Sequence, residues 1–168
     1  MPALTLPGPD GLRAYTTGAP GDFSAPDVPF NRVAFAAAHV VADPLADVDP
    51  WLTPAIDWEA TMAFRHHLWG QGLAIAEAMD TAQRGMGLGW TDALELVRRS
   101  VAEAKTVGGT VFSGVGTDHL APAPGQTTAD IRAAYLEQLH AIQGVGGRVI
   151  LMASRALAAA ARSADDYA

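Results

Sequence analysis

The sequence predicts an α/β fold in which about four parallel strands are joined by crossover helices, and three observations carry this prediction. Four short apolar runs, typical of buried strands, begin near residues 32, 73, 110 and 148. Stretches with apolar residues at helical spacing separate these runs, and glycines close the stretches. Strands that alternate with helices of this length form right-handed crossover units, which place the strands in one parallel sheet.

The composition favours one compact domain and excludes several classes of protein. The 168 residues are 49% hydrophobic and 17% charged, so the chain is neither disordered nor highly charged. Eleven Lys and Arg face eighteen Asp and Glu without a basic cluster, which argues against nucleic-acid and membrane partners. The absence of cysteine excludes disulfides and thiol chemistry. No apolar run approaches the roughly 20 residues of a membrane span, and we expect a cytoplasmic protein.

The first half of the chain is predicted to contain an arm, two strands and a helix. Residues 1–31 carry six prolines among Gly, Asp and Ser, and we interpret them as an irregular N-terminal arm. Residues 32–42 form a continuous apolar run that predicts the first strand. Helical spacing follows from Ile56 to Leu68, and residues 73–80 predict the second strand.

The second half of the chain is predicted to contain two further units, each a helix followed by a strand. Thr91 is the expected N-cap of a helix that leads to a third strand at 110–117. Thr127 and Asp130 have the spacing of a capping box and open another helix, which leads to a fourth strand at 148–154. We expect these apolar side chains in the core: Val33, Phe35, Ile75, Val111, Val149 and Leu151.

Polar side chains follow the predicted strands at their carboxyl ends, where the loops of a parallel α/β fold converge on one site. We expect several of them to share one concave pocket: His39, Glu77, Asp80, Asp118 and Arg155. The candidate catalytic residues are Glu77, Asp80 and Asp118. The candidate substrate-binding residues are His39, Thr81, Gly114, Thr117 and Arg155.

Each candidate also has a structural interpretation. His39 lies in an apolar run and fits a hydrogen-bonded core histidine. A buried Glu77 needs a partner such as Arg84 or Arg155, and a structural ion pair accounts for it as well as catalysis does. Asp80, Asp118 and Thr117 are residue types that cap loops. Lys105, the single lysine, is placed near the end of a helix rather than at a strand end.

Four segments carry a family resemblance: Ala36–Asp47, Glu77–Gly87, Gly114–Asp118 and Val149–Ala156. On them, the stretch from Arg32 to Tyr167 resembles the N-terminal half of an uncharacterised dihydrodipicolinate-synthase-like family of aldolase-type TIM barrels. The resemblance implies a partial (β/α) TIM barrel, with residues 32–168 as the N-terminal half of a (β/α)8 barrel after the arm.

The resemblance also implies an activity, that of a lyase or aldolase acting without a cofactor on a small oxygenated acid or a sugar-derived substrate. Thr81 and the backbone of 114–117 would then hold substrate oxygens, Arg155 a carboxylate, and Glu77 or Asp118 would move protons. The wider superfamily carries a Thr-Thr-Gly-Glu loop where this chain has Asp-Thr-Ala-Gln, so only Thr81 is kept. That superfamily takes its Schiff-base lysine from a later strand, and we expect this chain alone to be inactive.

Two other interpretations remain open. The first is a metal-dependent TIM-barrel enzyme that uses His39, Glu77, Asp118 and His119 as ligands. The second is a truncated fragment without catalysis, because a full barrel takes about 250 residues. Exposed barrel edges would then promote self-association or a homo-oligomer, and the expected partner of the site is a small-molecule substrate.

Overall fold

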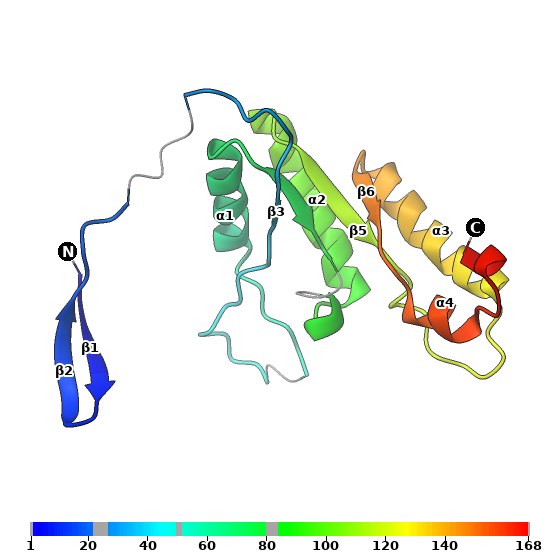
Figure 1. Ribbon diagram of the computed structural model, residues 1–168. Helices are drawn as coiled ribbons and strands as arrows, with labels where there is room; N and C mark the ends of the chain where they lie inside the picture. The colour runs from blue at the N-terminus through cyan, green and yellow to red at the C-terminus, as the bar shows by residue number, and fades with distance from the viewer. Residues whose placement is uncertain (1, 22–26, 50–51, 80–83, 168) are drawn as a thin grey trace.

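The computed structural model describes residues 2–21, 27–49, 52–79 and 84–167 (Figure 1). The strands are β1 (Ala3–Gly8), β2 (Gly11–Thr16), β3 (Phe35–Ala37), β4 (Ala74–Glu77), β5 (Val111–Val115) and β6 (Arg148–Leu151). The α-helices are α1 (Trp58–Gly70), α2 (Trp90–Val107), α3 (Thr128–Gly144) and α4 (Arg155–Ala160), and two short 3-10 helices are η1 (Arg84–Met86) and η2 (Ala164–Tyr167).

Four of the strands form one parallel sheet in the order β3-β4-β5-β6. This confirms the predicted parallel strands and their order along the chain. The hydrogen-bonded strands are shorter than the apolar runs that predicted them, since the first run covers 32–42 and the strand within it only Phe35–Ala37. The structure is therefore a mixed α/β fold.

The N-terminal arm was predicted to be irregular, and this prediction is wrong. Strands β1 and β2 pair as an antiparallel hairpin that lies apart from the larger sheet in Figure 1. The Thr17 amide donates to the Pro2 carbonyl at 3.1 Å. From this pair along the hairpin, hydrogen-bonded residue pairs alternate with pairs that form no backbone hydrogen bonds to each other. Pro7 faces Leu12 at one of the intervening pairs, where no amide proton is needed. The prolines thus fit the ladder instead of preventing it.

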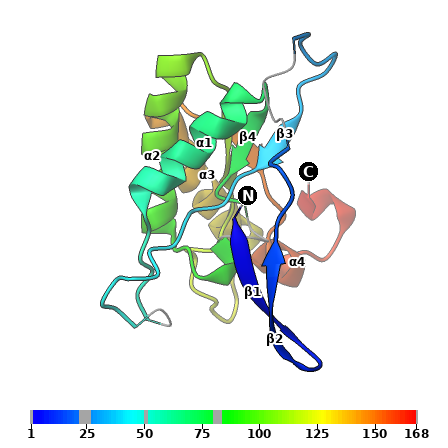
Figure 2. The same cartoon turned by 90° about the vertical axis from the view of Figure 1, so that its left-hand side faces the viewer.

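The long helices form a layer on one face of the sheet. Helix α1 packs on β4 and α2, and α3 packs on α2, β5 and β6. Figure 2 shows α1 and α2 together on one side of β3 and β4. The residues between this layer and the sheet include Ile75, Leu96 and Ile142, all fully buried. The core therefore lies between the helices and one sheet face.

The predicted core is right in part. Ile75 and Val111 are buried, and Val149 is partly buried against the core. Val33, Phe35 and Leu151 are exposed by 71%, 43% and 72%, which corrects the prediction for these three. Val33 precedes the first paired residue of β3, and Leu151 ends the edge strand β6. Phe35 follows the opposite pleat to Ile75, because its register partner in β4 is Ala74.

The helix ends also test the sequence. Thr127 caps α3, and its side chain and that of Asp130 form the predicted capping box. Thr91 is not the N-cap of α2, because the helix begins one residue earlier and its N-cap is Gly89. Within the described part of the chain, none of the helices has the length and apolar character needed to cross a bilayer.

Candidate functional site

A pocket of about 650 Å³ lies at the carboxyl ends of the neighbouring parallel strands β5 and β6. The loop after β5 and the start of α4 supply most of its lining. Its polar side chains are Arg84, Thr117, Asp118, Gln126, Ser154 and Arg155. Apolar residues complete the walls: Leu120, Pro122, Ala123, Pro124, Met152, Ala153, Ala156 and Ala159, besides Gly85 and Gly116. This mixture of apolar wall and few polar groups is typical of small-molecule sites.

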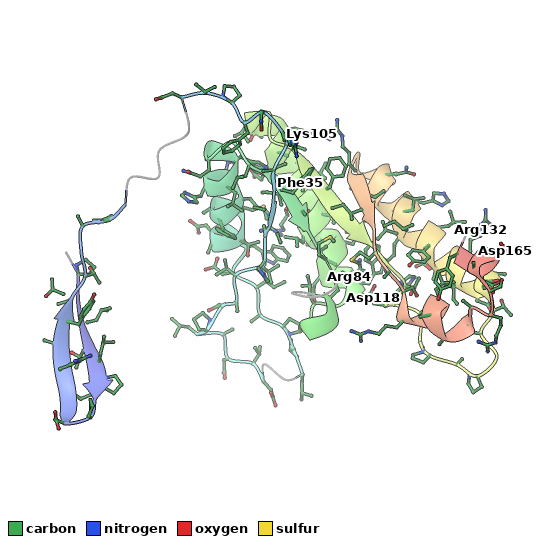
Figure 3. The ribbon with its side chains drawn as sticks, viewed as in Figure 1. Phe35, Arg84, Lys105, Asp118, Arg132 and Asp165 are labelled. Carbon is green, nitrogen blue, oxygen red and sulfur yellow. The ribbon has the colours of Figure 1, made fainter. Side chains whose placement is uncertain are left out.

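An ion pair between the buried Arg84 and the partly exposed side chain of Asp118 lies on one wall of the pocket, and the two residues lie next to each other in Figure 3. Arg84 Nε donates to Asp118 Oδ2 at 3.1 Å, and Arg84 Nη2 donates to Asp118 Oδ1. Arg84 Nη1 donates to the carbonyl of Gly114 at 2.8 Å. The guanidinium carbon also lies 5.1 Å from the centre of the Trp90 ring. Contacts with Asp118, Gly114 and Trp90 therefore hold the Arg84 side chain in one position.

Gln138 on α3 lies behind this ion pair and is fully buried. Its Oε1 accepts from Arg84 Nη2 at 2.7 Å and from the Gly116 amide at 2.8 Å. Its Nε2 donates to Asp118 Oδ1 at 3.2 Å. One amide side chain thus connects both members of the ion pair to the backbone that follows β5.

Two hydroxyl groups meet in the pocket. Thr117 Oγ1 and Ser154 Oγ are 2.6 Å apart, and both side chains are buried. Ser154 Oγ also accepts from the Leu157 amide at 3.0 Å, so it caps α4. The nearby Tyr135 hydroxyl donates to the Met152 carbonyl at 2.6 Å, and burial raises the pKa of Tyr135 while a hydrogen bond with Ser154 opposes the rise. Of these three hydroxyl-bearing residues, Thr117 and Ser154 line the pocket.

Arg155 supplies an exposed cationic group at the same pocket. It forms no hydrogen bond or ion pair with any residue that the structure describes. Because Arg84 and Asp118 neutralise each other, Arg155 leaves the described lining with one uncompensated positive charge. An anionic group is the ligand that this charge favours.

The structure brings together three of the predicted site residues, Thr117, Asp118 and Arg155. Gly114 is buried in β5 and lies behind the pocket rather than in its wall, and its carbonyl binds Arg84. This corrects its predicted contact with substrate. Asp80 and Thr81 lie outside the described residues, so their predicted roles remain predictions.

Glu77 does not share the pocket, which corrects the prediction that it converges there. It follows the same pleat as Ile75, so its side chain points between the sheet and the helices. Glu77 Oε2 accepts from Arg65 Nε at 2.9 Å and from Ser100 Oγ at 2.6 Å. Burial raises the pKa of Glu77, and the Arg65 guanidinium opposes that rise. The contacts define a structural ion pair with Arg65 instead of the predicted Arg84 or Arg155, and they remove the geometric basis for catalysis.

His39 also lies away from the pocket lining, with its side chain exposed and its carbonyl accepting from Arg65 at 3.1 Å. This corrects both the core interpretation and the predicted convergence. The four residues considered as metal ligands do not come together, since Glu77 pairs with Arg65 and Asp118 with Arg84. Among the described residues, no group of three or more His, Asp or Glu has the geometry to hold a metal ion.

Arg84, Gln138 and Ser154 are site residues that the predictions did not assign. The sequence feature that could have identified one of them is the position of Gln138 in α3. It follows Ile131 by seven residues and precedes Ile142 by four, so it lies on the apolar face of the helix. A polar side chain on such a face needs buried partners.

Lys105 lies at the opposite end of the sheet from Arg84 and Asp118 (Figure 3). It lines a smaller cavity of about 360 Å³ at the amino ends of β5 and β6, together with Arg148 and the glycine turns before each strand. As predicted, the only lysine of the chain is not at a strand's carboxyl end.

Fold and pocket together define an α/β protein with a pocket at the carboxyl edge of a parallel sheet. The chain belongs to the family described as Protein of unknown function (DUF993), whose model matches residues 4–168. No curated protein matches the chain.

Proposed function

We propose that this chain is part of a (β/α)-barrel lyase or aldolase, and that its pocket binds a small oxygenated acid or a sugar-derived acid. Arg155 binds the carboxylate, and the hydroxyl groups of Thr117 and Ser154 bind neighbouring substrate oxygens. The resemblance to dihydrodipicolinate-synthase-like sequences supports the reaction class, and a layer of helices on one sheet face is compatible with a barrel segment.

The observation that carries the proposal is the combination of charges and hydroxyls in the pocket. Arg155 has no counter-charge among the described residues, whereas Arg84 is fully satisfied by Asp118, Gln138 and Gly114. A ligand carboxylate can therefore pair with Arg155 without breaking an existing ion pair. The apolar wall leaves room for a short carbon skeleton.

The described lining of the pocket carries no lysine, because the only lysine, Lys105, lies at the other end of the sheet. Imine formation needs an amine next to the substrate carbonyl. We therefore expect this chain by itself to bind the acid without forming a Schiff base. Treatment with borohydride and pyruvate should leave its mass unchanged, and an adduct on Lys105 would contradict this part of the proposal.

Binding of small acids tests the pocket directly. Pyruvate and glycerate should bind the chain, as followed by calorimetry and by backbone NMR shifts at Thr117 and Ser154, while the corresponding amides should bind at least tenfold more weakly. Arg155→Gln should reduce binding of the acids about tenfold, which corresponds to about 1.4 kcal/mol. Arg132→Gln is the matched control, since Arg132 is exposed on α3 and outside the pocket. Equal binding of acids and amides would refute the proposal.

A further inference from the structure

We propose that Gln138 is a positioning residue of the pocket, and that the protonation state of His119 determines which hydrogen bonds Gln138 can form. In this arrangement, Gln138 holds Arg84 and Asp118 in place only while His119 is neutral and carries its hydrogen on Nε2. The inference rests on the proposed function only insofar as ligand binding uses this pocket. The hydrogen-bond geometry itself is independent of the ligand.

The chemistry of its neighbours fixes the orientation of the Gln138 amide. The amide oxygen position contacts Arg84 Nη2 at 2.7 Å and the Gly116 backbone nitrogen at 2.8 Å. A guanidinium and a backbone amide can only donate hydrogen bonds. The atom between them must therefore be the acceptor, Oε1, and the –NH₂ group must point the other way.

The tautomer of His119 follows from that orientation. Gln138 Nε2 lies 2.7 Å from His119 Nδ1 and 3.2 Å from Asp118 Oδ1, and it is the donor in both contacts. Nδ1 must then accept with its lone pair, so the hydrogen of the neutral ring is on Nε2. His119 Nε2 faces Glu137 Oε2 at 3.2 Å, which is an acceptor for that hydrogen.

Protonation of His119 creates a conflict that no rotation of Gln138 resolves. A hydrogen on Nδ1 would face the amide –NH₂ group, donor against donor. Rotating the amide would turn –NH₂ toward Arg84 and Gly116, which are also donors. Gln138 is fully buried and has no access to water, so it must lose partners. If the amide rotates, Asp118 loses one donor and Arg84 loses one acceptor.

The charged groups around His119 come from three segments. Glu137 on α3 and the adjacent Asp118 carry negative charges, and Arg84 of η1 carries a positive charge. The Glu137 side chain is 65% exposed, so solvent screens its effect, and Arg84 pairs with Asp118. The Trp90 ring, 6.1 Å away on α2, carries no charge. The donor conflict at Nδ1 is therefore the main structural consequence of protonation.

Side-chain ¹⁵N NMR of the ligand-free chain tests the tautomer. In its neutral form, His119 should show an unprotonated Nδ1 and a protonated Nε2. Gln138→Glu replaces the donor by a carboxylate and should move the hydrogen to Nδ1. Gln143→Glu, an exposed change on the same helix, should leave the tautomer unchanged. A wild-type ring with its hydrogen on Nδ1 would overturn the proposal.

A pH titration tests the coupling. The Gly116 amide shift should follow the protonation of His119 with the same midpoint, and pyruvate affinity should fall at least fivefold across it. In His119→Gln, whose amide oxygen can still accept from Gln138, both responses should disappear. A Gly116 amide shift that stays constant while His119 is protonated would overturn the proposed coupling. If pyruvate binds at no pH while Gly116 still follows His119, the ligand proposed above is wrong and the positioning role stands.

Discussion

At the scale of single residues, the strongest test concerns the ion pair of Arg65 and Glu77, whose side chains are both 0% exposed. Glu77→Gln leaves the Arg65 guanidinium buried without a counter-charge, and Arg65 Nη2 already has no hydrogen-bond partner among the described residues. We expect a loss of about 3–5 kcal/mol in the free energy of unfolding, measured with urea. The exposed pair of Glu95 and Arg99 on α2 is the control, and Glu95→Gln should cost less than about 1 kcal/mol.

The double variant Arg65→Met with Glu77→Met separates charge from packing. Removing both charges abolishes the unpaired ion, so the double variant should be more stable than the sum of the two single changes predicts. Additive losses would mean that the two side chains act independently, which would contradict the structural role assigned to the pair.

Gly114 provides a second prediction for a single residue. A Cβ at this position would lie 2.5 Å from the Ala78 carbonyl oxygen and 2.8 Å from Met152 Sδ. Gly114→Ala should therefore destabilise the fold by about 1–3 kcal/mol in thermal or urea unfolding. Gly144→Ala is the matched control, because a Cβ there meets no atom within 4 Å and α3 gains a better helix former. Equal effects of the two changes would contradict the packing around β5.

At the scale of elements, the start of α3 makes a prediction about pH. Hydrogen bonds from the Thr127 amide and hydroxyl lower the pKa of Asp130 below its usual value of 3.8. A lowered pKa in the folded state means that Asp130 stabilises the helix above pH 3.8, and this contribution is lost as the pH falls through the folded-state pKa. NMR titration of the Asp130 carboxyl should show a midpoint below 3.8.

Substitutions at the capping box give this prediction its control. Thr127→Ala removes the hydroxyl that bonds Asp130 and should move the midpoint back toward 3.8. Thr128→Ala changes the next residue, whose side chain takes no part in the capping box, and should leave the titration unchanged. Identical titrations of Asp130 in both variants would show that the capping box is not the cause.

At the scale of the whole molecule, the exposed edge of the sheet predicts self-association. Within the described residues, β6 pairs with β5 on one edge only, and its last residue Leu151 is 72% exposed. An unpaired edge with an apolar side chain favours contact with a second chain. Sedimentation velocity should show oligomers that Leu151→Arg reduces, whereas Leu45→Arg, in a loop at 92% exposure, should not. A monomer at every concentration would contradict the prediction.

The sequence by itself determined the order and type of most elements. Helical spacing, glycine stops and the Thr127 capping box depend on neighbours within a few residues, so they can be recognised along the chain. The hairpin was missed because proline tolerance depends on which register position a proline occupies, and only the pairing partner decides that. Local patterns thus predicted the parallel sheet but not β1 and β2.

Only the tertiary structure decided which polar groups meet. The residues of β4 before Glu77 are apolar on both faces of the sheet. The sequence pattern therefore does not predict whether the Glu77 side chain points to the helices or away from them. The pocket network joins Arg84 to Asp118 across 34 residues and to Gln138 across 54. Contacts over such separations depend on how the helices pack on the sheet, and no local spacing encodes them.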